Sequence, residues 1–327
     1  MRAMPALHLA RIERLSRLVG GALEIRDETL IARPCSVEAA RRVVAAAASE
    51  RIPLGEGGLV LDRGALRNVG LVDPRAMWIH AGAGARVRDV EQALQRAGLT
   101  LGSQPPAVFE GTVAAWLEGP FAGRRAMDGR LESGVAAVQA VLPDGRPLDT
   151  RPAPRSAAGP AVAHLILGGG SRCGFLLGAT LKARRLPASE ERILLEGETE
   201  GLLRLLLRAL RGHLPPIEAC FLGPRRLALR CGAAREDERA ALHVLRRCAG
   251  QAGIRHGEAG ELPPPGGEAW EVEPARLAAV VEGLGPDEPL HLVRMARESC
   301  IAVGRRSGEA IAGPDDLLDR ICAALRR

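Results

Sequence analysis

The fold is indicated by one stretch in the middle of the chain, Gly129-Arg-Leu-Glu-Ser-Gly-Val-Ala-Ala-Val-Gln-Ala-Val-Leu-Pro-Asp-Gly145. Its small and apolar residues over 135–142 predict a long strand, and the Pro-Asp-Gly sequence at its end predicts a turn. Beyond a proline-rich loop we expect a short helix near 160–167, the glycine-rich segment Gly168-Gly-Gly-Ser-Arg-Cys-Gly174 and a strand that runs to Lys182.

The residues before this stretch predict a mixture of strands and helices. Ser36 is a candidate N-cap for a helix that reaches about Glu50, because apolar residues follow it at helical spacing. The other expected elements are a strand 29–33, a strand that begins at Ile52 and leads into Gly55-Glu-Gly-Gly58, strands 59–62 and 78–81, and a helix 87–97. This order is typical of an α+β unit.

From about residue 190 the order of elements is typical of a split βαβ, ferredoxin-like unit. The expected elements are strand 192–195, helix 199–211, strands 217–222 and 225–231, helix 235–252 and strand 253–256, then a helix 274–284, a hairpin of 289–295 and 299–304, and a last helix 315–326. With 327 residues the chain has the length of about two domains. We therefore divide it into an N-terminal segment 1–24 with a short amphipathic helix over 7–19, a first domain over 25–188 and a second, small α+β domain over 189–327.

The composition is that of an ordinary globular protein with a mild positive charge. Hydrophobic residues make up 46%, charged residues 26%, and the net charge is +6. The arginines are interspersed with acids, as in Arg235-Glu-Asp-Glu-Arg239, so we do not expect a nucleic-acid partner, which needs a concentrated basic face. The chain has no tyrosine, which excludes mechanisms that need a phenol.

The seven cysteines are widely spread and include no CxxC pair. This pattern predicts neither a disulfide framework nor a zinc site, and we expect small buried side chains in a reducing compartment. The arginine-punctuated N-terminus does not have the pattern of a signal peptide, and no apolar run is long enough to span a membrane. A cytoplasmic location is the expectation.

The residues over about 25–188 resemble the FAD-binding domain of the p-cresol methylhydroxylase (PCMH) type, which includes vanillyl-alcohol oxidase, alkyl-dihydroxyacetonephosphate synthase and the glycolate oxidase subunits. The resemblance is carried by 129–145, by Gly159-Pro-Ala-Val-Ala-His-Leu-Ile-Leu-Gly168, and by Gly174 and Ala179-Thr-Leu-Lys182 before Pro187. It implies two α+β subdomains, over about 25–85 and 86–188, that hold FAD in an extended pose between them.

The resemblance also implies which residues would hold the cofactor. Backbone N–H groups can face a diphosphate where no Cβ crowds it, which is the general reason for glycine at such positions. In this chain the implied pyrophosphate loop is Gly55, Gly57 and Gly58, the residues along the flavin are Gly111, Thr112 and Gly129, and the later closing loop is Gly168, Gly169 and Gly174. No histidine lies in these loops, so the FAD would be held non-covalently.

Each of the three implied cofactor loops departs from the family pattern. The first loop normally continues through small and hydroxyl residues, but here Gly58 runs straight into Leu59. Thr112-Val-Ala-Ala115 stands where relatives have Thr-x-Gly-Gly, and 168–174 departs from Gly-Ser-Glu-Gly-Thr-Leu-Gly. Asp128 replaces the aromatic residue that normally precedes the glycine. The loops have therefore lost hydroxyl groups, glycines and a ring that relatives place near the flavin.

The second domain is similar in length and layout to the small cap of the glycolate oxidase FAD-binding subunit. His256, His291 and Arg294 are the candidate general base and anion anchor in this cap. His80 and His164 lie on apolar elements and are expected in the core. No His or Cys pair has the spacing of metal ligands, so no metal is expected.

Three functions remain open. The first is an FAD-dependent oxidoreductase component that oxidises a small hydroxylated, 2-hydroxy acid-like substrate together with partner oxidoreductase subunits. The second is a flavin-free, degenerate member that acts as a scaffold or regulatory partner. Nucleic-acid binding through the arginines is the third and least favoured.

Overall fold

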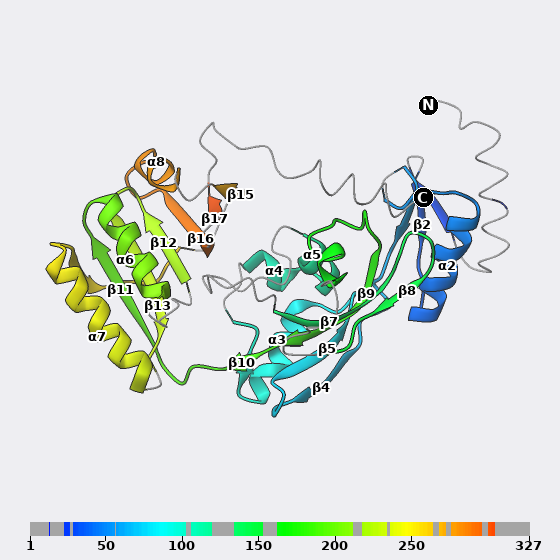
Figure 1. Cartoon of the computed structure of the whole chain (residues 1–327), viewed down its shortest axis with the longest axis horizontal. Coiled ribbons are helices and arrows are strands. Elements are labelled where there is room, and N and C mark those ends of the chain that lie inside the picture. Colours follow the sequence, from blue (N-terminus) through cyan, green and yellow to red (C-terminus); the bar gives the residue numbers. More distant parts are fainter. Residues whose placement is uncertain are drawn as a thin grey trace.

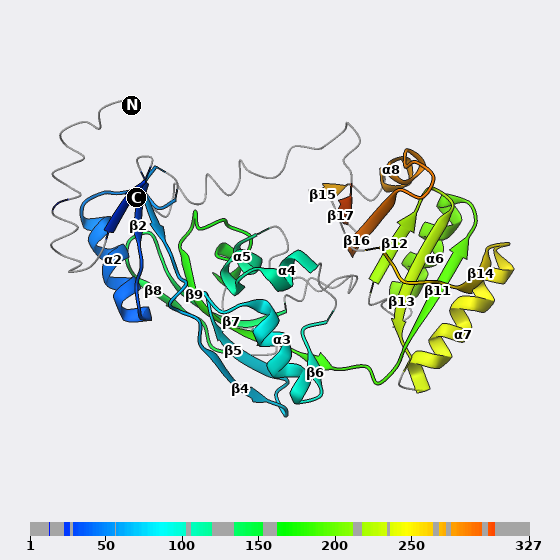
Figure 2. The ribbon, with the colours of Figure 1, turned by 180° about the vertical axis from the view of Figure 1, so that it is seen from behind.

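The computed structural model describes residues 13, 23–26, 29–55, 57–102, 106–119, 134–152, 162–211, 218–233, 236–263, 268–272, 276–295 and 300–304. These residues form two lobes (Figure 1). Residues 186–189 lead from the last strand of the first lobe into the second lobe, as the view from behind also shows (Figure 2).

The first lobe begins with a three-stranded sheet covered by one helix. The sheet has the order β1-β2-β3, and its strands are β1 (Leu23–Arg26), β2 (Thr29–Ala32) and β3 (Leu59–Leu61). Helix α2 (Val37–Ser49) connects the parallel strands β2 and β3. The predicted N-cap is confirmed, because Ser36 Oγ accepts a hydrogen bond from Ala39 N at 3.1 Å.

A five-stranded antiparallel sheet forms the rest of the first lobe. Its order is β4-β5-β9-β7-β8, with β4 (Val69–Asp73), β5 (Trp78–Gly82), β9 (Phe175–Lys182), β7 (Val135–Val141) and β8 (Pro147–Asp149). The other elements are α3 (Val87–Arg96), β6 (Leu99–Thr100), α4 (Pro106–Glu110), α5 (Val113–Glu118), a 3-10 turn (Val162–Leu165) and β10 (Arg184–Arg185). The long strand predicted from the middle stretch is confirmed as β7.

Strand β9 joins the hydrophobic cores of the two sheets. Phe175 and Leu177 pack against α2 and β3, whereas Leu176 and Leu181 pack against α3 and α5. Every residue of β9 except the last is buried, as expected for a strand covered on both faces. The strand therefore fixes the position of the first sheet relative to α5.

The second lobe is a seven-stranded antiparallel sheet with helices on one face. Its order is β14-β11-β13-β12-β16-β17-β15, with β11 (Glu190–Glu196), β12 (Glu218–Leu222), β13 (Arg226–Gly232), β14 (Arg255–Glu258), β15 (Glu268–Val272), β16 (Pro289–Met295) and β17 (Cys300–Gly304). Helices α6 (Thr199–Arg211), α7 (Glu236–Gln251) and α8 (Leu277–Glu282) share its core. The first four strands have the order of the predicted split βαβ unit.

Several local expectations are wrong. Residue 52 does not begin a strand, because Ile52 N donates to Ala47 O at the end of α2 and Leu54 forms a single bridge to Leu59. His80 and His164 are exposed; β5 turns its neighbour Ile79 inward and His80 outward. The sequence did not predict six of the strands, which are β1, β4, β6, β8, β10 and β15.

The cysteines also differ from the expectation of seven buried, unpaired side chains. Cys35 is exposed, and Cys173 is disulfide-bonded, so wide spacing in the sequence did not exclude a pair that forms on folding. Cys220 and Cys231 are buried as expected. Apart from Glu13, the predicted helix 7–19 lies outside the described residues, as does the predicted helix 315–326. None of the described helices has the length and apolarity that a membrane span requires.

Candidate functional site

Two of the three implied cofactor loops meet the short helix α5, one at each end. At its start, Thr112 is the N-cap, and its Oγ1 accepts a hydrogen bond from Ala115 N at 3.2 Å. At its end, Gly168 N donates to Leu117 O at 2.8 Å, and Gly170 N donates to Glu118 O at 3.1 Å. The structure therefore places the loops around Thr112 and Gly168 on one helix.

A buried ion pair lies where α5, the end of β3 and the 168–174 loop converge. Arg63 Nη1 donates to Glu118 Oε1 at 2.5 Å, and Arg63 Nη2 donates to Glu118 Oε2 at 2.9 Å. Ser171 Oγ donates to Oε2 and Leu176 N to Oε1, both at 2.9 Å. The side chains of Arg63 and Glu118 are 15% and 7% exposed. We call these four residues the Glu118 cluster.

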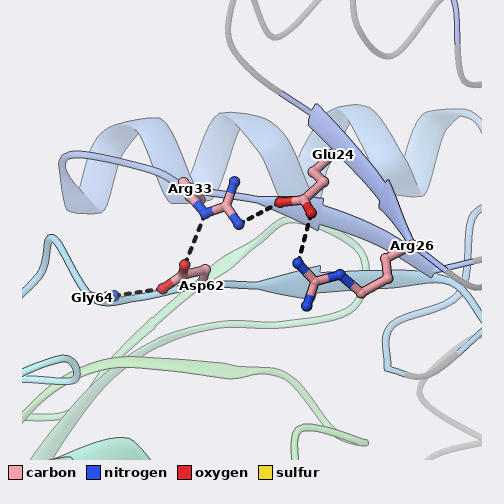
Figure 3. A network of polar contacts seen from close by, with 5 residues as sticks. All are labelled: Glu24, Arg26, Arg33, Asp62 and Gly64. Carbon is pink, nitrogen blue, oxygen red and sulfur yellow. Dashed lines mark hydrogen bonds and ion pairs between the residues drawn. The ribbon is translucent and has the colours of Figure 1, made fainter.

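The turn after β3 directs Arg63 into this cluster. Asp62 Oδ1 accepts a hydrogen bond from Gly64 N, and Asp62 Oδ2 accepts one from Arg33 Nε, both at 3.0 Å (Figure 3). Arg33 in turn pairs with Glu24 of β1, so the turn is anchored to the first sheet (Figure 3). These contacts lower the pKa of Asp62, chiefly through the backbone hydrogen bond from Gly64.

The backbone of Arg63 packs so closely against Gly84 that position 84 has no room for a side chain. A Cβ added at Gly84 would lie 2.0 Å from Arg63 O. Arg63 O also accepts a hydrogen bond from Leu66 N at 2.8 Å. The guanidinium lies over the Phe175 ring, 5.7 Å from its centroid. Arg63 is thus held by β3, by the turn at Gly84 and by β9.

The implied pyrophosphate loop forms a closed turn. Gly55 N donates to Leu59 O at 2.8 Å, Gly57 N to Thr29 Oγ1 at 3.1 Å, and Gly58 N to Gly55 O at 3.1 Å. A Cβ at Gly58 would lie 2.1 Å from Pro53 O, so this glycine is required for packing of the turn itself. All three N–H groups are bonded within the chain, which favours the strand-ending turn over an anion cradle.

The later glycine loop is closed in the same way. Gly168 N and Gly170 N donate to α5, Gly169 N donates to Ile166 O at 3.2 Å, and Arg172 N donates to Gly169 O at 3.0 Å. A Cβ at Gly174 would lie 2.5 Å from Val141 O, so close packing on β7 explains this glycine. The described parts of the loops, as they stand, do not fit a cofactor diphosphate. Gly129 lies outside the described residues.

The candidate residues of the second lobe are not brought together. His256 is exposed on the edge strand β14, and His291 is buried on β16. Three strands separate them, which at about 4.8 Å per strand is roughly 19 Å. Arg294 follows His291 on β16, and its side chain lies outside the described part.

His256 lines a surface hollow of about 630 Å³. The hollow's other lining residues are Glu190, Glu191, Arg192, Arg246, Gly257, Glu258 and Ala259. Three carboxylates and two guanidiniums do not favour an anion, so this hollow does not support His256 beside an anion anchor.

His291 lies between a carboxylate and a thiol. Its Nδ1 is 3.4 Å from Glu218 Oε1, and its Nε2 is 3.5 Å from Cys220 Sγ. Burial raises the pKa of Cys220 to about 12, with a further contribution from the charge of Glu218. The thiol is therefore neutral and not an activated nucleophile. The described residues contain no group of His, Cys, Asp and Glu that could hold a metal.

Sequence reasoning missed Arg63, Glu118 and Ser171. Nothing in the sequence distinguished Arg63 from the other Lys and Arg residues, of which the chain has 45 in all. The available signals were a single acid at the end of the otherwise apolar α5, and an Asp-Arg-Gly turn directly after a predicted strand.

The first lobe is similar in sequence to FAD-binding domains. Residues 29–151 match a family model described as an FAD binding domain. The uncharacterized FAD-linked oxidoreductase YgcU of Escherichia coli K12 is 32% identical over 131 residues, which are 39% of this chain and 26% of that protein. YgcU of E. coli O157:H7 matches to the same extent. The match thus spans about a quarter of these relatives' length.

Solved structures match over most of the chain. An alkyldihydroxyacetonephosphate synthase aligns with a TM-score of 0.64 and 15% identity, covering 91% of this chain and 73% of that one. The 4-ethylphenol oxidase from Gulosibacter chungangensis, in complex with isoeugenol, aligns with a TM-score of 0.65 and 15% identity, covering 93% and 83%. The predicted mixed α+β fold is thereby confirmed over most of the chain.

Proposed function

We propose that this chain is a component of an FAD-linked oxidoreductase that oxidises a small hydroxylated, 2-hydroxy acid-like substrate together with partner subunits. The observation that carries the proposal is the FAD-binding-domain match of residues 29–151 on a chain with the corresponding fold. The name of the relative YgcU supports the oxidoreductase class. The substrate class and the partners rest on the resemblance of the second lobe to the glycolate oxidase cap.

The flavin would supply the redox chemistry, and the protein would supply binding and orientation. The described N–H groups of both glycine loops are bonded within the chain, so on this proposal the loops would have to rearrange before these groups could face a phosphate.

A flavin-free scaffold is the second candidate. The observation that favours it is the hydrogen-bond count: every described N–H of Gly55, Gly57, Gly58, Gly168, Gly169 and Gly170 is bonded within the chain. A protein that no longer binds a diphosphate would keep the fold and lose the open amides. On this alternative the chain would act as a scaffold or regulatory partner without a flavin.

One binding experiment separates the two candidates. The purified full chain is titrated with FAD, and both the flavin fluorescence and the thermal unfolding midpoint are followed. The oxidoreductase proposal expects saturable binding and a higher midpoint, since a ligand specific to the native state stabilises it. Riboflavin, which lacks the diphosphate, is the matched control and should bind more weakly. Absence of both effects would count against the oxidoreductase proposal and favour the flavin-free candidate.

The substrate class is tested separately. A chain that binds FAD should reduce an artificial electron acceptor when small 2-hydroxy acids are added, and the corresponding deoxy acids should be inactive. Turnover with phenols but not with hydroxy acids would contradict the proposed substrate class.

A further inference from the structure

The Glu118 carboxylate is surrounded by hydrogen-bond donors that would suit a free anion. The guanidinium of Arg63 supplies two parallel N–H groups, Ser171 supplies a hydroxyl and Leu176 a backbone N–H, all between 2.5 and 2.9 Å from the two carboxylate oxygens. A planar guanidinium fork recognises carboxylate and phosphate alike. A fork, a hydroxyl and an amide that converge in a buried place constitute an oxyanion site.

Two of these donors, the Arg63 guanidinium and the Leu176 N–H, are held by contacts other than those with the Glu118 side chain. Arg63 is held by the Asp62 turn, by Phe175 and by Leu176 O, which accepts from its Nη1 at 3.3 Å. Leu176 belongs to the buried strand β9. The 168–170 backbone is attached to α5 through the main-chain oxygens of residues 117 and 118. Removing the carboxylate would therefore leave the Arg63 guanidinium and the Leu176 N–H in place.

Two residues of the Glu118 cluster occupy positions that are unfavourable for their residue types. Ser171 has φ +66°, a left-handed conformation that favours glycine, and its hydroxyl reaches Glu118 from there. Glu118 is the last residue of α5, where the negative end of the helix dipole disfavours a carboxylate. The local backbone therefore opposes both residues, and their mutual contact stabilises them.

We propose that the Glu118 cluster is an oxyanion-binding site which the chain fills with its own carboxylate. Glu118 acts there as an internal anion that joins the end of β3, α5 and the 168–174 loop in the cofactor-free protein. The ligand class that this donor set takes is a small oxyanion with the geometry of a carboxylate. This inference goes beyond the proposed function, because it concerns the chain without flavin and is independent of FAD binding.

The experiment is chemical rescue of the full chain carrying Glu118→Ala. Thermal unfolding is followed by circular dichroism in sodium formate, acetate, inorganic phosphate or chloride at equal ionic strength. Formate or acetate should raise the midpoint of the variant by roughly 3–6 °C over chloride and leave the wild-type midpoint unchanged. A similar rise with phosphate would extend the ligand class to oxyanions in general.

The matched control is the double variant Arg63→Met with Glu118→Ala, which removes the guanidinium as well as the carboxylate. Rescue should disappear in this variant. If Glu118→Ala does not fold in chloride, recovery of the folded signal in formate supports the site. The proposal is overturned if none of the three anions stabilises Glu118→Ala beyond chloride, or if the double variant and the wild type gain as much. FAD binding plays no part in this readout, so failure here leaves the proposed function standing.

Discussion

Arg63 and Glu118, 55 positions apart in the chain, face each other through two parallel N–H···O hydrogen bonds of 2.5 and 2.9 Å. Arg63 follows the first sheet, and Glu118 ends the helix that packs on β9 of the second sheet. A buried ion pair is stabilising only when its geometry and its additional hydrogen bonds offset desolvation of both charges. Ser171 and Leu176 supply those additional bonds, so the pair joins the turn after β3 to the end of α5.

The pair predicts a strongly non-additive mutation series. Glu118→Ala and Arg63→Ala should each lower the free energy of unfolding by about 3–5 kcal/mol, because each leaves one buried charge without its partner. Replacing both residues, by Arg63→Met with Glu118→Leu, should cost much less than the sum of the two single changes. Urea denaturation of the four proteins measures the coupling. Additive losses would show that the two side chains act independently.

The left-handed backbone of Ser171 predicts different stabilities for two small substitutions at this position. Ser171→Ala loses the hydrogen bond to Glu118 and keeps the strained φ of +66°, whereas Ser171→Gly loses the same bond but relieves the strain. The glycine variant should therefore be the more stable of the two by about 1 kcal/mol. Thermal or urea unfolding decides between them. Equal stability would mean that the serine conformation carries no strain.

Cysteine labelling should follow burial. Burial raises the pKa values of Cys220 and Cys231 to about 12, so neither is a thiolate near neutral pH. Cys35 is exposed. Iodoacetamide on the native protein at about pH 8 should label Cys35 and leave the other two unmodified until denaturant is added. Peptide mass spectrometry measures the extent of alkylation at each cysteine. Comparable labelling of Cys220 in the native chain would contradict its buried position beside His291.

The second lobe should lose stability in acid through Glu218. Burial raises the pKa of this carboxyl, but the hydrogen bond with His291 and the charge of Arg230 outweigh burial, so the pKa lies below its ordinary value. A carboxyl with a lowered folded-state pKa stabilises the protein above its unfolded pKa, about 4.3, and this contribution disappears as the pH falls through the folded value.

Glu218→Gln should therefore weaken the dependence of stability on pH below about 4.3. Urea unfolding at neutral pH and near pH 3 measures it, and Glu236→Gln, on the exposed first turn of α7, is the matched control. An unchanged acid dependence in Glu218→Gln would show that the contacts with His291 and Arg230 do not lower the pKa of Glu218 in solution.

The sequence predicted the elements whose signals are local. Ser36 before an apolar helix, the small apolar run of β7 and the strand and helix order of the second lobe depend on neighbouring residues, and the structure has all three. Strand β4 escaped prediction because it is an edge strand without apolar alternation, and its Leu71 is 96% exposed.

The site was less predictable than the fold for two physical reasons. Glycine has both a conformational and a packing use, and the sequence does not distinguish an open anion loop from a turn closed by its own carbonyls, as at Gly58 and Gly174. The Glu118 cluster joins residues from three distant segments, so no spacing in the chain indicates it. His256 and His291 were chosen by residue type alone, and the sheet order separates them.

The most direct test of the proposed function is an FAD titration of the wild-type chain, followed by flavin fluorescence and by thermal unfolding. We expect saturable binding, weaker binding of riboflavin, and an unfolding midpoint that rises with FAD concentration. No binding to the wild type, together with none to Arg63→Met with Glu118→Leu in which the internal ion pair is absent, would contradict a flavin site in this chain.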